Sequence, residues 1–189
     1  MKVIPFYYDD FDDLNANTYV VIDDLNQCVV IDPSKDYDGI INYIEKNNLT
    51  LKGVLLTHGH IDHTRGVNKL INHFHVPYFI GFEEETLLNH PLMNCSIFID
   101  GKDIKFNSKP ELVSEGEKLH LLNEDIECIH TPFHTSGSYC YFLRNSKLLF
   151  TGDFLFKGSV GRSDLPTGSN KDFPHSIQKI MALDDEVKI

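Results

Sequence analysis

The segment 57–63, Thr-His-Gly-His-Ile-Asp-His, is the densest group of potential metal ligands in this chain. Its three imidazoles and one carboxylate belong to His58, His60, His63 and Asp62. Neutral imidazole and ionised carboxylate are the usual protein ligands of zinc and related divalent metals. Without a metal, three clustered histidines would be costly to desolvate at the end of a strand. The segment therefore predicts a metal site.

Short strands and amphipathic helices are predicted to position this segment. Residues 18–22 and 27–31 have the β-branched content and spacing of a hairpin. Apolar residues within 36–47 recur at helical spacing, which predicts a helix that covers a sheet. The continuous apolar run 54–56 predicts a strand buried on both faces. Segment 57–63 follows the carboxyl end of that strand, where open sheets bind their ligands.

The rest of the chain is predicted to be richer in strands. Helices are expected at 64–74, 83–89 and 171–183, the last with Ile177, Ile180 and Met181 facing inward. Strands are expected at 77–80, 96–100, 104–106, 118–122, 126–130, 138–143 and 147–151. This order predicts an α/β (α+β) fold in which two packed mixed sheets carry helices on their outer faces, a four-layer αββα sandwich.

Composition bounds the class of protein. With 189 residues, of which 41% are hydrophobic and 24% charged, the chain has enough apolar residues for one sizeable core. We therefore expect residues 1–189 to form a single domain. The net charge of −11 argues against nucleic acid or an anionic membrane as a partner, because phosphate binding requires clustered lysine and arginine.

Two further features bear on the compartment. The chain has no charged-then-apolar leader and no apolar run of about 18 residues, which predicts a cytoplasmic protein. The four cysteines form no Cys-x-x-Cys pair and are expected to be reduced and mostly buried; they are Cys28, Cys95, Cys128 and Cys140.

Three later segments also place polar residues after apolar runs, and they are 130–138, 151–153 and 158–164. Together with segment 57–63 they resemble the metallo-β-lactamase superfamily. The signature of that superfamily is a Thr-His-x-His-x-Asp-His loop, a later Thr-Pro-x-His-Thr and a Gly-Asp after the next hairpin. The order and spacing match over essentially the whole chain. Segments 17–19, 30–33, 151–156 and 159–166 look most like the short, single-domain glyoxalase II-like (hydroxyacylglutathione hydrolase-like) enzymes.

The resemblance implies a role for each residue of the motifs. His58, His60 and His134 would hold a first metal, Asp62 and His63 would belong to a second, and Asp153 would bridge both. The cofactor implied is zinc, up to two ions, with iron or manganese as alternatives. The reaction implied is hydrolysis of a small-molecule thioester by metal-bound hydroxide attack on the carbonyl, with Asp62 as the catalytic residue that orients the attacking oxygen.

Other residues near these motifs leave alternatives open. Arg162 falls where glutathione-using members keep a lysine that contacts a substrate carboxylate, and arginine binds carboxylates as well. Alternatively, Arg162 and Asp164 pair with each other and only fix the turn. Substrate binding by these two residues is therefore one of two interpretations. Asp32 precedes a proline at a strand end and is expected to be a turn former more often than a support for the site.

The chain also departs from the superfamily pattern. Phe133 stands where glycine is usual and Ser136 where proline is common. In the superfamily the final helix leads to a strand and a Gly-His-Gly loop, whose histidine completes the second metal site. Residues 186–189 would begin that strand, so we expect a domain that is C-terminally incomplete and lacks its last strand and helix. The second metal site is then expected to be weaker, with His175 a less favoured substitute ligand.

Three other functions compete with thioester hydrolysis. A persulfide dioxygenase-like oxidoreductase would need only one iron, and an inactive metal-binding module would need no complete second site. A phosphodiesterase of nucleic acids is disfavoured by the acidic charge. The absence of a C-terminal helical extension argues against glutathione specificity.

Overall fold

A six-stranded mixed sheet forms one half of the fold in a computed structural model, which describes residues 1–8, 14–35 and 38–189. Its strands, in spatial order, are β1 (Lys2–Phe6), β2 (Thr18–Ile22), β3 (Gln27–Ile31), β4 (Thr50–Leu55), β5 (Tyr78–Gly81) and β6 (Glu111–Val113). Strands β1 to β3 pair antiparallel, and β3 to β6 pair parallel. The predicted hairpin of β2 and β3 is confirmed.

A second, antiparallel sheet of four strands forms the other half. Its strands, in spatial order, are β10 (Leu148–Phe150), β9 (Tyr139–Leu143), β8 (Ile126–His130) and β7 (Lys118–Leu119). A small hairpin follows, made of β11 (Leu155–Phe156) and β12 (Ser159–Val160). Near the end of the chain, Lys188 forms an isolated parallel β-bridge with Leu148 of β10. The segment 186–189, predicted to begin a strand, therefore pairs with β10 at this one position.

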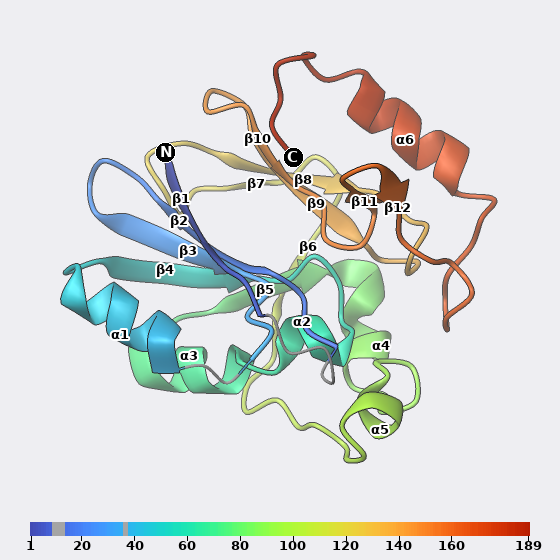
Figure 1. Cartoon of the computed structure of the whole chain (residues 1–189), viewed down its shortest axis with the longest axis horizontal. Helices are drawn as coiled ribbons and strands as arrows, with labels where there is room; N and C mark the ends of the chain where they lie inside the picture. Colours follow the sequence, from blue (N-terminus) through green and yellow to red (C-terminus); the bar gives the residue numbers. More distant parts are fainter. Residues whose placement is uncertain (9–13, 36–37) are drawn as a thin grey trace.

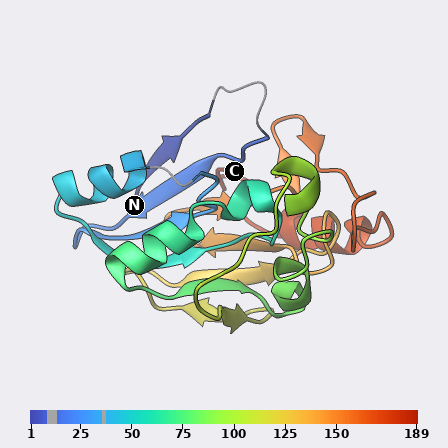
Figure 2. The same cartoon turned by 90° about the horizontal axis from the view of Figure 1, so that it is seen from below.

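The two sheets face each other, and helices cover their outer faces. Figure 1 shows α1 (Asp38–Lys46) and α3 (Val67–Phe74) outside the first sheet and α6 (Phe173–Met181) outside the second. Figure 2 shows α1 and α3 lying across the strands of the first sheet. Along β3, Cys28 and Val30 pack in the cluster under these helices, whereas Val29 and Ile31 pack in the cluster between the sheets. This alternation buries both faces of β3, and the predicted αββα sandwich is confirmed.

Some predicted elements differ from the structure. Residues 96–100, expected to be a strand, contain the short helix α5 (Ser96–Ile99), in which the amide of Ile99 donates to the Cys95 carbonyl at 2.9 Å. Residues 104–106 lie in no strand. Phe98 is 72% exposed, so its side chain packs neither against a neighbouring strand nor in the core, and the β propensity of phenylalanine is not realised there. Met181 was expected to face inward and is 75% exposed, because the apolar face of α6 ends with Ile177 and Ile180.

Helix boundaries shift by a few residues from the predicted ones. The helix expected at 83–89 divides into a 3₁₀ turn, η1 (Phe82–Glu84), and α4 (Glu85–Leu88). The helix expected at 64–74 likewise divides into α2 (Ile61–Thr64) and α3. The first predicted helix starts at Asp38, and its expected residues 36–37 lie outside the described part of the chain. Within the described ranges, no helix is both long enough and apolar enough to cross a bilayer.

The four cysteines are buried free thiols, as predicted. Burial raises the pKa of Cys28, Cys128 and Cys140 to about 12, so on the order of 10⁻⁴ of each would be thiolate at pH 8. We therefore expect a thiol-specific chromogenic reagent to label the folded protein very slowly and to titrate all four thiols after denaturation in guanidinium. Rapid labelling of two or more thiols in the folded protein would contradict this burial.

Candidate metal centre

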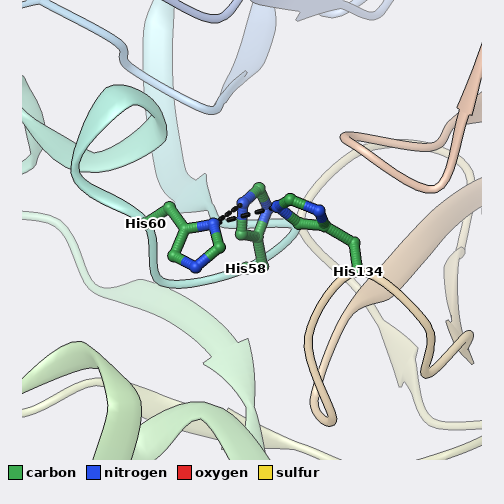
Figure 3. Close-up of side chains that lie close together, drawn as sticks. All are labelled: His58, His60 and His134. Carbon is green, nitrogen blue, oxygen red and sulfur yellow. Dashed lines mark hydrogen bonds between the residues drawn. The ribbon is translucent and has the colours of Figure 1, made fainter. Parts of the chain in front are cut away.

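Three imidazoles from the two halves of the sandwich meet at one point. His58 and His60 follow β4, and His134 follows β8 in the other sheet. His58 Nε2 lies 3.0 Å from His60 Nδ1, which lies 2.9 Å from His134 Nε2 (Figure 3). All three side chains are almost fully buried. The sequence motifs therefore converge although His60 and His134 are 74 residues apart.

The outer nitrogens of two of these rings fix which nitrogen faces inward. His134 Nδ1 donates to the carbonyl oxygen of Arg162 at 2.7 Å, so its Nε2 carries a lone pair. His58 Nδ1 lies 3.2 Å from the hydroxyl of Thr57, which already donates to Asp32. The Nδ1 of His58 must then donate, which leaves a lone pair on its Nε2 as well. Both lone pairs point at the Nδ1 of His60.

This arrangement fits a cation better than a proton. A single proton on the Nδ1 of His60 can satisfy only one of the two lone pairs that face it, whereas a cation between the three nitrogens is bound by all of them. Burial and the neighbouring imidazoles lower the pKa of His60 to about 3 and hold the pKa of His58 well below its usual range. Both rings are therefore neutral, the form in which imidazole binds metals. His58, His60 and His134 form a group whose ligand atoms all lie within 4.8 Å of one another.

A second group lies beside the first and has more carboxylates. The Nδ1 of His63 donates to Asp32 Oδ2 at 2.9 Å, so its Nε2 faces the interior of the site. That Nε2 lies 3.2 Å from Asp153 Oδ1 and 3.7 Å from Asp62 Oδ2, without hydrogen-bond geometry to any described residue. His63, Asp153 and His58 also have ligand atoms within 4.8 Å of one another.

Asp153 stands between the two groups. Its Oδ1 faces His63, and its Oδ2 lies 3.5 Å from His134 Nε2. Burial would raise the pKa of Asp153, but the charged imidazole of His63 is the largest opposing cause, and the pKa falls to about 2. Burial likewise lowers the pKa of His63, but the carboxylates of Asp32, Asp153 and Asp62 outweigh it and hold that pKa well above its usual range. The two groups are thus coupled through one carboxylate.

Asp32 supports the site as well as ending a strand. It has a positive φ of 48° directly after β3, and its side chain is buried. Its Oδ1 accepts from the amide of Thr57 at 2.8 Å, and its Oδ2 accepts from the hydroxyl of Thr57 and from His63. Of the two interpretations that the sequence left open for Asp32, the less favoured one, a support for the site, is therefore confirmed. The proximity could not be read locally, because Asp32 and His63 are 31 residues apart.

A glycine allows the loop of Asp153 to approach the histidine segment. Gly152 has a φ of +49°, and a Cβ built there would lie 2.2 Å from Thr57 Oγ1. Any other residue would be strained and would displace Thr57. On the other side, Phe133 packs against Phe154 and Phe173, with ring centroids 6.1 and 4.8 Å apart. Phe133, which replaces the usual glycine, thus anchors the loop of His134 to α6.

The remaining predicted residues lie outside the two groups. Arg162 and Asp164 form a bidentate pair at 2.6 and 2.8 Å, and both side chains are mostly exposed. The Arg162 side chain thus makes the turn-fixing contact, while its carbonyl oxygen orients His134. His175 is exposed on α6 and belongs to neither group, so the described residues do not use it as a substitute ligand.

Comparison with protein families identifies the architecture. The model of the metallo-beta-lactamase superfamily matches residues 11–187. The chain belongs to this superfamily. Its members are generally hydrolases that bind divalent metals, and the histidine and aspartate groups described above are candidate ligands in this member.

Relatives and solved structures agree with this assignment. The chain is 34% identical over 183 residues to the hydroxyacylglutathione hydrolase GloC of Haemophilus influenzae, covering 92% of this chain and 82% of GloC. It superposes with a TM-score of 0.90 on BLEG-1, a B3 metallo-beta-lactamase, at 29% identity over 98% of this chain and 88% of that one. A di-iron-bound form of TTHA1623 gives a TM-score of 0.83 at 26% identity, covering 97% and 88%.

Proposed function

We propose that this superfamily member is a metal-dependent hydrolase of small-molecule thioesters, similar to hydroxyacylglutathione hydrolases. The observation that carries the proposal is the pair of ligand groups that share Asp153. His58, His60 and His134 would hold the first ion, Asp62 and His63 the second, and Asp153 both. Bound divalent cations there would polarise a substrate carbonyl and lower the pKa of water. The relation to GloC supports a thioester as the substrate class.

The side chains of the site divide the work between binding and proton handling. The histidines are buried, whereas the side chains of Asp62 and Asp153 are 21% and 25% exposed, so substrate would approach from the carboxylate side. Asp62 would accept a hydrogen bond from the attacking water and orient it towards the carbonyl carbon. Burial raises the pKa of Asp62, which makes its carboxylate a better proton acceptor.

The decisive test is turnover by the metal-loaded protein. S-lactoylglutathione hydrolysis that depends on added zinc, with no opening of a chromogenic β-lactam, is the expected result. Oxygen consumption on a persulfide substrate with one bound iron would favour the persulfide dioxygenase-like alternative. Metal binding without turnover of any of these substrates would favour the inactive module.

The two metal sites are expected to differ in affinity. The described residues offer three imidazoles and a shared carboxylate to the first ion, but one imidazole, Asp62 and the same shared carboxylate to the second. Fewer donors give weaker binding and an easier exchange for iron or manganese. Titration of the metal-free protein with zinc against a chromophoric chelator should therefore resolve one tight and one weaker equivalent. Two zinc equivalents bound with equal affinity would contradict the predicted difference between the two sites.

Arg162, with Asp164 as its partner, is proposed to bind a carboxylate of the substrate. Replacing Arg162 by alanine should raise KM for a carboxylate-bearing thioester by roughly fivefold at most and leave kcat nearly unchanged, because exposed ion pairs are weak. Arg144→Ala is the matched control, since Arg144 is equally exposed and pairs with Glu127 at 2.7 Å. Equal steady-state constants for wild type and Arg162→Ala would leave the Arg162–Asp164 pair with a turn-fixing role only.

A further inference from the structure

Glu84 is a fully buried carboxylate beside the metal centre. It ends the 3₁₀ turn η1, and its neighbours Glu83 and Glu85 are exposed while Glu84 is 0% exposed. Its Oε2 accepts from the amide of Gly59 at 2.7 Å, and its Oε1 accepts from the amide of Gly137 at 3.0 Å. Buried carboxylates are rare, and this one makes two charge-assisted hydrogen bonds to main chain.

The two amides belong to the two loops that carry the imidazoles of the first group. Gly59 lies between His58 and His60, and Gly137 follows His134 by three residues. The carboxylate therefore bridges a loop of the first sheet and a loop of the second. One oxygen holds each loop, so the spacing of the loops depends on the length and direction of this single side chain.

Close packing leaves little freedom for this bridge. A Cβ built on Gly137 would lie 2.7 Å from Glu84 Cγ, and one on Gly59 would lie 2.8 Å from Leu87 Cδ2 and 3.2 Å from Glu84 Oε2. Both loops can approach Glu84 this closely only because residues 59 and 137 are glycines. The contacts all restrain main chain adjacent to a histidine of the first group.

We propose that Glu84 is a positioning residue that sets the distance between the His58–His60 pair and His134, and thereby the metal affinity of the first site. The inference rests on the proposed metal centre. Groups that orient metal ligands from outside typically change metal affinity about 10- to 100-fold when they are removed. A displacement of a few tenths of an ångström between the loops is large compared with the tolerance of metal–ligand distances.

The experiment uses Glu84→Gln, which keeps the shape of the side chain but replaces one oxygen by an NH₂ group. That NH₂ group would face an N–H donor, so one of the two loops loses its acceptor. Zinc affinity of the metal-free proteins is measured by competition with a chromophoric chelator, without substrate. We expect the tight equivalent of Glu84→Gln to bind about 10- to 100-fold more weakly than wild type.

Two controls separate positioning from general destabilisation. Glu85→Gln makes the same change at the adjacent exposed position and should leave zinc affinity unchanged. Asp23→Asn removes a buried carboxylate that accepts from the amides of Leu25, Gln27 and Asn123 at 2.8 to 2.9 Å, outside the two ligand groups. Asp23→Asn should therefore lower the denaturation midpoint without changing zinc affinity.

The outcomes are distinguishable. Unchanged zinc affinity in Glu84→Gln, with a denaturation midpoint lowered as in Asp23→Asn, overturns the inference and makes Glu84 purely structural. Absence of tight zinc binding in wild type would instead defeat the proposed metal centre. Where Glu84→Gln does not fold, Glu84→Asp replaces it, because the shorter carboxylate keeps the charge but reaches only one loop. Wild-type affinity in Glu84→Asp would equally overturn the inference.

Discussion

Replacing His134 by alanine is expected to lower kcat/KM for thioester hydrolysis by about 10³-fold or more. The change removes one of three imidazoles whose ligand nitrogens lie within 4.8 Å of one another, and with it the neighbour of Asp153 Oδ2. A metal contributes several kcal/mol to the stabilisation of charge in a transition state, and each 1.36 kcal/mol is a factor of about ten in rate. Steady-state kinetics with metal analysis of the same sample would measure both losses.

A histidine outside the site gives the matched control for this variant. His120 is 77% exposed in its side chain, and its Nδ1 lies 2.7 Å from Asp125 Oδ1. His120→Ala should retain wild-type turnover and metal content. Full turnover and an undiminished metal content in His134→Ala would remove this histidine from the proposed site.

Replacing Asp32 by alanine is expected to destabilise the metal-free protein by about 3 kcal/mol or more. The change leaves the buried imidazole of His63 and the amide and hydroxyl of Thr57 without their acceptor. Removing one partner of a buried pair costs about 3–5 kcal/mol, because the other is left uncompensated. For a chain of this size that corresponds to a fall in Tm of roughly 6–12 °C. Urea unfolding in the presence of a chelator separates this loss from metal loss.

The exposed pair of His73 and Glu45 supplies the comparison. Its atoms are 2.7 Å apart, closer than in the buried pair, but the two side chains are 43% and 54% exposed. Glu45→Ala should therefore change the free energy of unfolding by no more than about 0.5 kcal/mol. Equal losses in Asp32→Ala and Glu45→Ala would show that burial of the Asp32–His63 pair has no energetic consequence.

The sequence predicts those features that local pattern encodes. The apolar runs 28–31 in β3 and 54–56 at the end of β4 have both faces buried, so composition alone indicates central strands. The histidine segment after β4 is recognisable because its ligands are neighbours in the chain. The prediction of a strand at 96–100 was wrong because apolar composition there does not indicate burial. Ile97 and Phe98 are apolar but remain exposed.

The supporting residues could not be predicted, because their roles depend on contacts between distant segments. Asp32 acts on Thr57 and His63 across 25 and 31 residues. Glu84 acts on Gly59 and Gly137 across 25 and 53 residues. Nothing in the run Glu83-Glu84-Glu85 indicates which carboxylate turns inward. Only the docking of the two sheets selects it.

The ligands of the proposed centre are divided between the two sheets, with His58 and His60 after β4 and His134 after β8. An ion held by all three would act as a cross-link between halves of the sandwich that touch otherwise through side-chain packing and hydrogen bonds. By mass action, free metal at about 1,000 times its Kd would stabilise the folded state by about 4 kcal/mol. Metal supply would then set the equilibrium stability of the folded chain as well as its activity.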